Sequence, residues 1–142
     1  KPIPIYGNGN NIRDWLYVTD HCDAIADVLN RGVVGETYNI GGESEMTNLD
    51  VVRKVCSVLD ELRPSISGES YEHLIEYVTD RPGHDRRYAV DITKVKQELG
   101  WTPKQTFESG IRKTIQWYLD NQEWVDRVRS GAYREWIIKQ YG

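Results

Sequence analysis

Short strand-like segments alternate with helical segments along this chain, and no other feature of the sequence constrains its fold as strongly. In the helical segments apolar residues recur three or four positions apart, whereas the strand-like segments are short and rich in β-branched and aromatic residues. Such alternation predicts an α/β layer structure. Strands are expected at residues 1–6, 12–18, 36–40 and 74–78, and helices at residues 19–32, 47–63, 91–100 and 106–118.

Three of the expected helices carry recognisable ends. Thr47 followed by Asp50 has the spacing of a capping box, and Thr106 is placed to cap the last long helix. Asp91 can cap a short helix that Gly100 closes, because glycine tolerates the left-handed backbone of a helix C-terminus. These ends predict where the chain leaves each helix.

The first helix and the tail have weaker signals. Thr19 or Asp20 is expected to cap the first helix, which ends near a left-handed Gly32. Its expected apolar face consists of Ala24, Ile25, Val28 and Leu29. The tail is expected to be helical in pieces, with apolar side chains at Trp124, Val125, Val128, Tyr133, Trp136 and Ile137.

Three or four short strands make only a small sheet. If residues 36–40 form a buried strand, its neighbours are expected on a segment outside this chain. The turn at Gly7-Asn-Gly-Asn-Asn11 joins two strand-like segments and predicts a β-hairpin. A dinucleotide-binding loop is the alternative, but such a loop leads from a strand into a helix. Here it leads into a strand.

Charge and composition exclude several classes of protein. The formal charge is −4, from 18 Lys and Arg against 22 Asp and Glu, so a nucleic-acid partner is not expected. No apolar run approaches the roughly 20 residues that span a bilayer, and no signal peptide opens the chain. We expect a cytoplasmic protein without membrane contact. Cys22 and Cys56 lack the spacing of a metal or redox pair and are expected to be buried free thiols.

Familiar catalytic patterns are absent from the sequence. No Tyr is followed four residues later by Lys, so the general-base pair of short-chain dehydrogenases is missing. No Gly-x-Ser-x-Gly motif occurs, and the three histidines lack metal-ligand spacing. The chain is therefore expected to contain neither catalytic residues nor a metal site.

The segment Asp80-Arg-Pro-Gly-His-Asp-Arg-Arg-Tyr88 concentrates three arginines, a histidine and a tyrosine in a probable loop. A guanidinium presents a rigid fork of donors that matches phosphate oxygens, and each charge-assisted bond contributes about 1.5–3 kcal/mol. A diphosphate is one ligand that this composition fits. The alternative is that Asp80 and Asp85 pair with neighbouring arginines on a solvated surface.

Two further residues are candidates for binding. Arg13 lies between apolar positions of a short strand, which directs it either toward a cleft or toward solvent, where it would pair with Asp14 or Asp20. Asn48 is either a ligand or a cap for the second helix, and position alone favours the cap.

Taken together, several strings of residues closely resemble the C-terminal half of dTDP-glucose 4,6-dehydratases, essentially from end to end of the chain. Two of the strings resemble that family in particular, whereas the Tyr-Asn-Ile-Gly and Leu-Gly-Trp-x-Pro pieces are similar to extended short-chain dehydrogenases in general. The two particular strings are Arg13-Asp-Trp-Leu-Tyr-Val18 and the arginine-rich segment 80–88. The others are Pro4-Ile-Tyr-Gly-Asn-Gly9, Gly35-Glu-Thr-Tyr-Asn-Ile-Gly-Gly42, Glu98-Leu-Gly-Trp-Thr-Pro103, Thr106-Phe-Glu-Ser-Gly110 and Ser130-Gly-Ala-Tyr133.

The resemblance implies a definite division of labour. An N-terminal Rossmann domain, absent from this chain, would hold NAD and the catalytic residues of a homodimeric lyase. Residues 1–142 would form the small C-terminal substrate-binding domain, with one strand belonging to the missing Rossmann sheet. No cofactor is expected on this chain, and the isolated segment is expected to be inactive.

The resemblance also implies which residues meet the substrate, a dTDP-hexose that the enzyme converts to a 4-keto-6-deoxy sugar. Arg13 and Asn48 would face the diphosphate and the base. Three residues would lie beside the nucleotide and sugar, namely Pro4, Ile5 and Tyr6. Five more would close over the nucleotide end: His84, Asp85, Arg86, Arg87 and Tyr88.

Two other functions remain open from the sequence. The chain could be a freestanding module that binds nucleotide sugars without catalysis, which the absent catalytic residues favour. It could instead be part of a related nucleotide-sugar epimerase or decarboxylase that uses the same scaffold.

Overall fold

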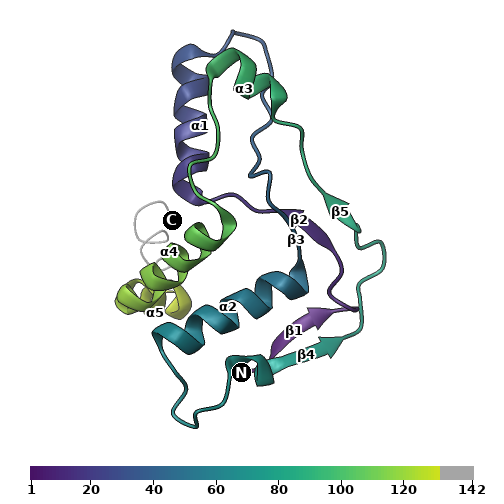
Figure 1. Ribbon diagram of the computed structural model, residues 1–142, viewed down its shortest axis with the longest axis vertical. Helices are drawn as coiled ribbons and strands as arrows, with labels where there is room; N and C mark the ends of the chain where they lie inside the picture. The colour runs from purple at the N-terminus through teal and green to yellow at the C-terminus, as the bar shows by residue number, and fades with distance from the viewer. Residues whose placement is uncertain (132–142) are drawn as a thin grey trace, which may run out of the picture.

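The computed structural model describes residues 1–131 and shows two small sheets with helices packed beside them (Figure 1). The strands of the described part are β1 (Ile3–Tyr6), β2 (Ile12–Asp14), β3 (Glu45–Thr47), β4 (Ile75–Val78) and β5 (Arg87–Tyr88). Its helices are α1 (Val18–Arg31), α2 (Asn48–Leu62), the 3₁₀ helix η1 (Tyr71–Leu74), α3 (Thr93–Leu99), α4 (Phe107–Asp120) and α5 (Gln122–Ser130). The predicted α/β class is confirmed for these residues.

Each sheet joins strands from distant parts of the sequence. One pairs β1 with β4 in parallel, and the other has the order β3-β2-β5, with β2 antiparallel to β3 and parallel to β5. The predicted hairpin is therefore wrong, because β1 and β2 lie in different sheets. The backbone N–H of Gly7 donates to the carbonyl of Val78 at 2.9 Å, so the turn continues the β1–β4 pairing and does not fold back on β1.

The expected strand at residues 36–40 is extended but has no strand partner among residues 1–131. Its side chains still alternate as they do in a strand, since Tyr38 and Ile40 pack on the core while Thr37 and Asn39 are exposed. Residues 37–40 make no backbone-to-backbone hydrogen bond within the described part of the chain.

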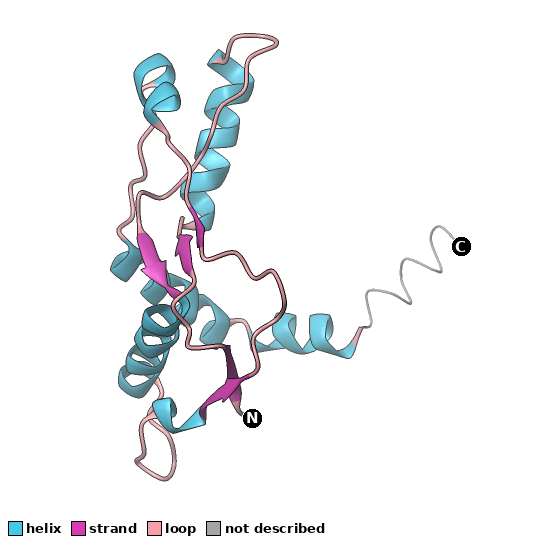
Figure 2. Ribbon diagram, turned by 90° about the vertical axis from the view of Figure 1, so that its right-hand side faces the viewer, coloured by secondary structure: helices cyan, strands magenta, loops and turns pink. Residues whose placement is uncertain are grey.

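The buried core lies between α1, α3 and this extended segment (Figure 1). Ala24 and Val95 are completely buried there, and Ile92, Leu99 and Trp101 are nearly so. A second packed region joins α2 to α4 and η1, with Cys56 completely buried on α2. Figure 2 shows the two regions toward opposite ends of an elongated molecule, with the β3-β2-β5 sheet between them and the β1–β4 pair at the lower end.

The predicted caps are found at the starts of α2 and α4 and at the end of α3, whereas α3 starts after Ile92, so Asp91 lies one residue before the observed capping position. The Thr47 hydroxyl accepts from the Asp50 N–H at 3.1 Å, and the Thr106 hydroxyl accepts from the Ser109 N–H at 3.2 Å. Asp91 accepts from the Thr93 N–H at 2.7 Å, and Gly100 closes α3 with φ +67°. Local capping chemistry was therefore sufficient to locate these ends.

Helix α1 departs from its predicted ends and face. It begins after Tyr17, so neither Thr19 nor Asp20 caps it, and Gly32 has an ordinary φ of −67°. Ile25 and Leu29 are 53% and 84% exposed, so only part of the predicted apolar face is buried. In the tail, Trp124, Val125 and Val128 lie on α5, whereas Tyr133, Trp136 and Ile137 lie outside the described residues.

The two cysteines of the chain differ in burial. Cys56 is buried, which raises the pKa of its thiol, but Cys22 is exposed, so half of that prediction is wrong. Between residues 1 and 131, no helix is long and apolar enough to cross a membrane.

Candidate functional site

The turn between β1 and β2 holds the N-terminus of α2. The carbonyl of Asn11 accepts from the Asn48 N–H at 3.0 Å, and the carbonyl of Gly9 accepts from the Leu49 N–H at 3.1 Å. Free N–H groups at a helix start are what usually attract a phosphate. Because these are already bonded, the backbone at the start of α2 is not an anion site.

The same turn holds the arginine-rich segment beside β2. The buried Asn11 amide donates to the carbonyl of Asp85 at 3.2 Å, and the Ile12 N–H donates to the carbonyl of Arg86 at 2.7 Å. The parallel pairing of β2 with β5 then places Arg13 opposite Tyr88. Backbone pairing therefore brings together the two strings that resemble the dehydratases in particular.

Arg13 is held by groups that carry no negative charge. Its guanidinium donates to the carbonyls of Ile12 and Asp85 at 2.6 and 3.2 Å, and it lies 3.1 Å from Nε2 of His84. It also sits over the ring of Tyr88, with its central carbon 4.6 Å from the ring centroid. These contacts fix the guanidinium but leave its charge uncompensated, which suits an anionic ligand.

The surface ion pair considered for Arg13 is not found. Asp14 instead accepts from the N–H groups of Gly42 and Ser44 at 2.8 and 2.7 Å. Asp20 is buried and accepts from the N–H groups of Lys104 and Gln105 at 2.9 and 2.8 Å. Both carboxylates are committed to backbone donors, and no ion pair of Arg13 occurs in the described residues.

The acidic residues of the segment do not pair with its arginines either. Asp80 accepts from Nδ1 of His84 at 2.7 Å, and this bond lowers the pKa of Asp80. Asp85 accepts from the Tyr88 hydroxyl, which raises the pKa of Tyr88 because the bond favours the protonated phenol. Arg86 is exposed, and its side chain makes no hydrogen bond or ion pair within residues 1–131.

Arg87 lies on the opposite face of the sheet from Arg13. In register, Arg13 stands opposite Tyr88 while Arg87 stands opposite Ile12, and neighbouring residues of a strand point to opposite faces. The Arg87 guanidinium forms a two-point ion pair with Glu45 of β3, at 2.5 and 2.6 Å. This pair lowers the pKa of Glu45. The predicted site residues of β5 are thus divided between two faces.

The remaining predicted residues lie next to the same turn. Along β1, Pro4 and Tyr6 are exposed while Ile5 is only 4% exposed and packs inward. Asn48, half-buried, is the first residue of α2 and is tied to the turn through Asn11. The structure therefore gathers strand β1, the start of α2 and the arginine-rich segment around one turn, with the Ile5 side chain pointing away from the surface.

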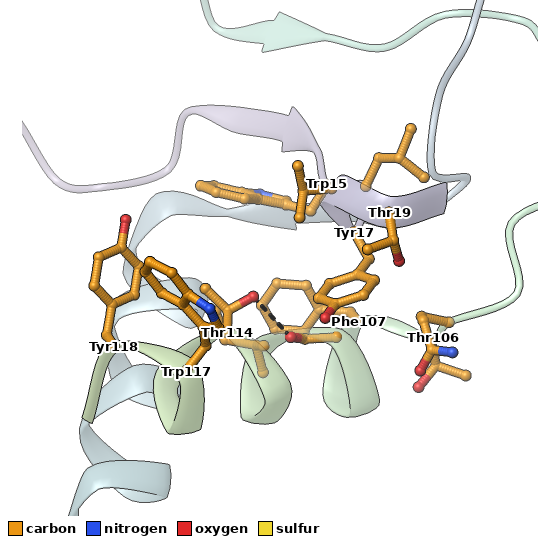
Figure 3. Close-up of a pocket in the computed structure, with 13 residues that line it drawn as sticks. Trp15, Tyr17, Thr19, Thr106, Phe107, Thr114, Trp117 and Tyr118 are labelled. Carbon is orange, nitrogen blue, oxygen red and sulfur yellow. Dashed lines mark hydrogen bonds between the residues drawn. The ribbon is translucent and has the colours of Figure 1, made fainter. Parts of the chain in front are cut away.

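A separate cavity of about 570 Å³ lies between the β2–α1 connection and helix α4 (Figure 3). Its walls are largely aromatic, with Trp15 packed edge-on against Phe107 at 6.3 Å and with Tyr17, Trp117 and Tyr118 nearby. None of the predicted substrate residues lines it. The apolar stripe along residues 107–118 indicates its α4 wall, but nothing in the sequence joins that wall to residues 15–19.

The fold is similar to that of solved nucleotide-sugar dehydratases. It superposes on a dTDP-glucose 4,6-dehydratase from Bacillus anthracis in complex with NAD, with a TM-score of 0.75 and 52% identity over 87% of this chain and 36% of that one. It also superposes on a dTDP-glucose 4,6-dehydratase from Streptomyces venezuelae with NAD and TYD bound, with a TM-score of 0.71 and 40% identity over 87% of this chain and 35% of that one.

Sequence comparison gives the family. The chain belongs to the GDP-mannose 4,6-dehydratase family, whose model matches residues 1–114. It is 59% identical over 141 residues to the dTDP-glucose 4,6-dehydratase of Salmonella typhimurium, covering 99% of this chain and 38% of that protein. The chain thus spans little more than a third of the length of the curated relatives it matches, and it corresponds to a fragment of such an enzyme.

Proposed function

We propose that this chain is the substrate-binding part of an NAD-dependent dTDP-glucose 4,6-dehydratase and that it holds the nucleotide diphosphate of the sugar substrate. The observation that carries the proposal is the Arg13 guanidinium, fixed by three uncharged acceptors and left with its full charge. The identity to dTDP-glucose 4,6-dehydratases over nearly the whole chain supports the same substrate class.

The geometry suggests a role for each residue on this face. Arg13 meets the diphosphate, and the exposed Arg86 closes on it from the neighbouring segment. Asn48 contacts the base, while Pro4 and Tyr6 border the nucleotide and sugar from the exposed side of β1. Ile5 supports that strand from behind.

His84, Asp85 and Tyr88 shape the site by holding Arg13. Arg87 stays in the proposed set, but its guanidinium is engaged by Glu45 on the opposite face. Direct contact with the same phosphate as Arg13 would require Arg87 to leave that ion pair.

We place NAD and the catalytic residues outside this chain, on a Rossmann domain against which residues 37–40 would pair as a strand. The turn at residues 7–11 does not fit a dinucleotide. It leads into β2, and the space beside its two glycines is filled by Asp80, Ile5 and Leu49. The intact protein is proposed to be a cytoplasmic, homodimeric lyase, as the resemblance implies.

The proposed division of labour has an energetic reason. Contacts to the nucleotide, which does not react, hold the hexose in place against groups on the other domain. Loss of such remote contacts therefore lowers turnover as well as affinity.

The full-length protein tests the proposal. Given dTDP-glucose and NAD, it should form the 4-keto-6-deoxy sugar, and Arg13→Ala or Arg86→Ala should weaken dTDP binding roughly 10- to 100-fold, since each removes about 1.5–3 kcal/mol of charge-assisted bonding. Calorimetry measures the affinity, and the content of bound NAD should be unchanged.

Arg112→Ala is the matched control for these variants. It removes an exposed arginine that pairs with Glu61 at 2.6 Å on a different part of the molecule, and we expect no change in dTDP affinity. Equal dTDP affinity in Arg13→Ala and the parent would remove Arg13 from the site, and absence of the keto sugar would refute the dehydratase assignment.

A non-catalytic nucleotide-sugar binding module is the second candidate. It is favoured by one observation, namely that Arg13 and all the groups that hold it lie within this chain. Calorimetry with dTDP on residues 1–142 separates the two functions. Clear binding by a folded monomer supports the module, whereas an aggregated or silent chain supports a part that needs the rest of the enzyme.

A further inference from the structure

Arg13 is the end of a chain of side chains that begins at Asp80. Oδ1 of Asp80 lies 2.7 Å from Nδ1 of His84, and Nε2 of the same ring lies 3.1 Å from the Arg13 guanidinium. The His84 side chain is only 8% exposed, so its ring is held between these two partners. Within residues 1–131 Asp80 makes no hydrogen bond or ion pair with Arg13, and the two are linked through His84.

Donors and acceptors in this chain determine where the histidine proton lies. A guanidinium only donates, so Nε2 of His84 must accept, and the ring must be neutral with its proton on Nδ1. That proton is then donated to Asp80. An ionised Asp80 favours this arrangement, and the bond to His84 in turn lowers the pKa of Asp80.

We propose that Asp80 is a positioning residue that fixes the neutral, Nδ1-protonated form of His84 and thereby aims Arg13 at the ligand diphosphate. The identity of the ligand in this inference rests on the proposed function, whereas the arrangement of Asp80, His84 and Arg13 does not. Asp80 acts without touching the substrate, much as a carboxylate behind a metal-binding histidine orients that ring.

The turn after β1 provides the space for this carboxylate. Gly7 has φ +61°, and a Cβ on it would lie 2.9 Å from Oδ2 of Asp80. The Arg81 N–H also donates to Oδ1 of Asp80 at 2.9 Å. The Arg81 N–H therefore holds Asp80 on one side, and Gly7 leaves room for its carboxylate on the other.

The test is Asp80→Asn in the full-length protein. The amide has nearly the same size but no charge, and it can present either its oxygen or its NH₂ group to Nδ1, so it favours the Nδ1-protonated ring less than the carboxylate does. The other tautomer of His84 cannot accept from Arg13. We expect dTDP binding to weaken about tenfold, while binding of thymidine, which has no phosphate, stays unchanged. Asp23→Asn, which neutralises an exposed aspartate paired with Lys104, should leave both affinities unchanged.

A double-mutant cycle separates positioning from a general loss of structure. If Asp80 acts through Arg13, Asp80→Asn has no further effect on dTDP affinity once Arg13→Ala is present. Equal losses in the two backgrounds, or no loss in the single variant, would overturn the proposal while leaving the dTDP site intact.

A crystal structure of the Asp80→Asn protein gives a readout that does not depend on the ligand. We expect the Arg13 guanidinium to move away from Nε2 of His84. An unchanged position of Arg13 would overturn the positioning role of Asp80, whether or not the parent protein binds dTDP. Failure of the parent protein to bind dTDP would instead refute the proposed function.

Discussion

Two aspartates one turn apart on α1 have very different surroundings. Asp20 is 3% exposed and accepts two backbone N–H groups from the segment before α4, whereas Asp23 is exposed and pairs with the Lys104 ammonium. The sequence predicts a helix cap at Thr19 or Asp20, because an acidic residue near a helix start has the same local signature whether it caps the helix or bonds to a distant segment. Only the fold reveals that its partners lie 84 and 85 positions away.

Asp20→Asn should therefore destabilise the protein by about 1–3 kcal/mol, because a neutral amide oxygen in place of Oδ2 accepts the two N–H groups more weakly than a carboxylate, and the buried NH₂ group takes the place of Oδ1. Asp23→Asn is the control on the same helix and should have a much smaller effect, because exposed ion pairs contribute little. Urea unfolding followed by circular dichroism measures both. Equal stability of Asp20→Asn and the parent would show that these two hydrogen bonds do not hold α1 to the rest of the fold.

At the scale of elements, local signals predicted the ends of helices but not the partners of strands. Caps at Thr47 and Thr106 depend on atoms three residues away, so the sequence contains all the information they need. Pairing of β1 with β4 depends on residues about 70 positions apart. The hairpin prediction failed for that reason, and because carbonyls of the turn bond to α2.

The turn at residues 7–11 gives a prediction about two glycines with similar backbones. Gly9 and Gly100 have φ +74° and +67°, but a Cβ on Gly9 would lie 2.8 Å from Ile5 and 2.9 Å from Leu49, whereas none would meet an atom within 4 Å at Gly100. Gly100→Ala should cost about 1–2 kcal/mol of backbone strain. Gly9→Ala should cost about 1–3 kcal/mol more, from overpacking.

Thermal unfolding of the two glycine variants isolates crowding from backbone strain, because the strain is common to both. If Gly9→Ala were no less stable than Gly100→Ala, β1 and α2 would not be packed together at this turn.

For the whole molecule, the sequence predicted which arginine-rich segments lie together better than it predicted the orientation of their side chains. Arg13 and the segment 84–88 do come together, but the opposite orientation of Arg87 follows from strand register, which a single sequence does not show. The aromatic cavity beside α4 was missed because its walls come from residues 15–19 and 105–118, and each part alone has the composition of an ordinary core.

The extended segment 36–40 gives a prediction for the intact protein. Amide hydrogens of Thr37 and Asn39 should exchange rapidly in the isolated chain, because no strand within residues 1–131 pairs with them, and slowly in the full-length protein if they join a Rossmann sheet. Hydrogen exchange read by mass spectrometry measures both. Rapid exchange of these two amides in the full-length protein would contradict the proposed strand. The amides of helix α2 serve as the internal standard for slow exchange in both proteins.

The parallel strand pairs also determine when the chain can fold as it is made. Ile3 pairs with Ile75, and Arg13 pairs with Tyr88. Neither parallel pair can therefore form until both of its strands have left the ribosome. Closing loops of that size is slow and leaves apolar strands exposed meanwhile. The contacts around Arg13 therefore cannot form before residues 84–88 have been made.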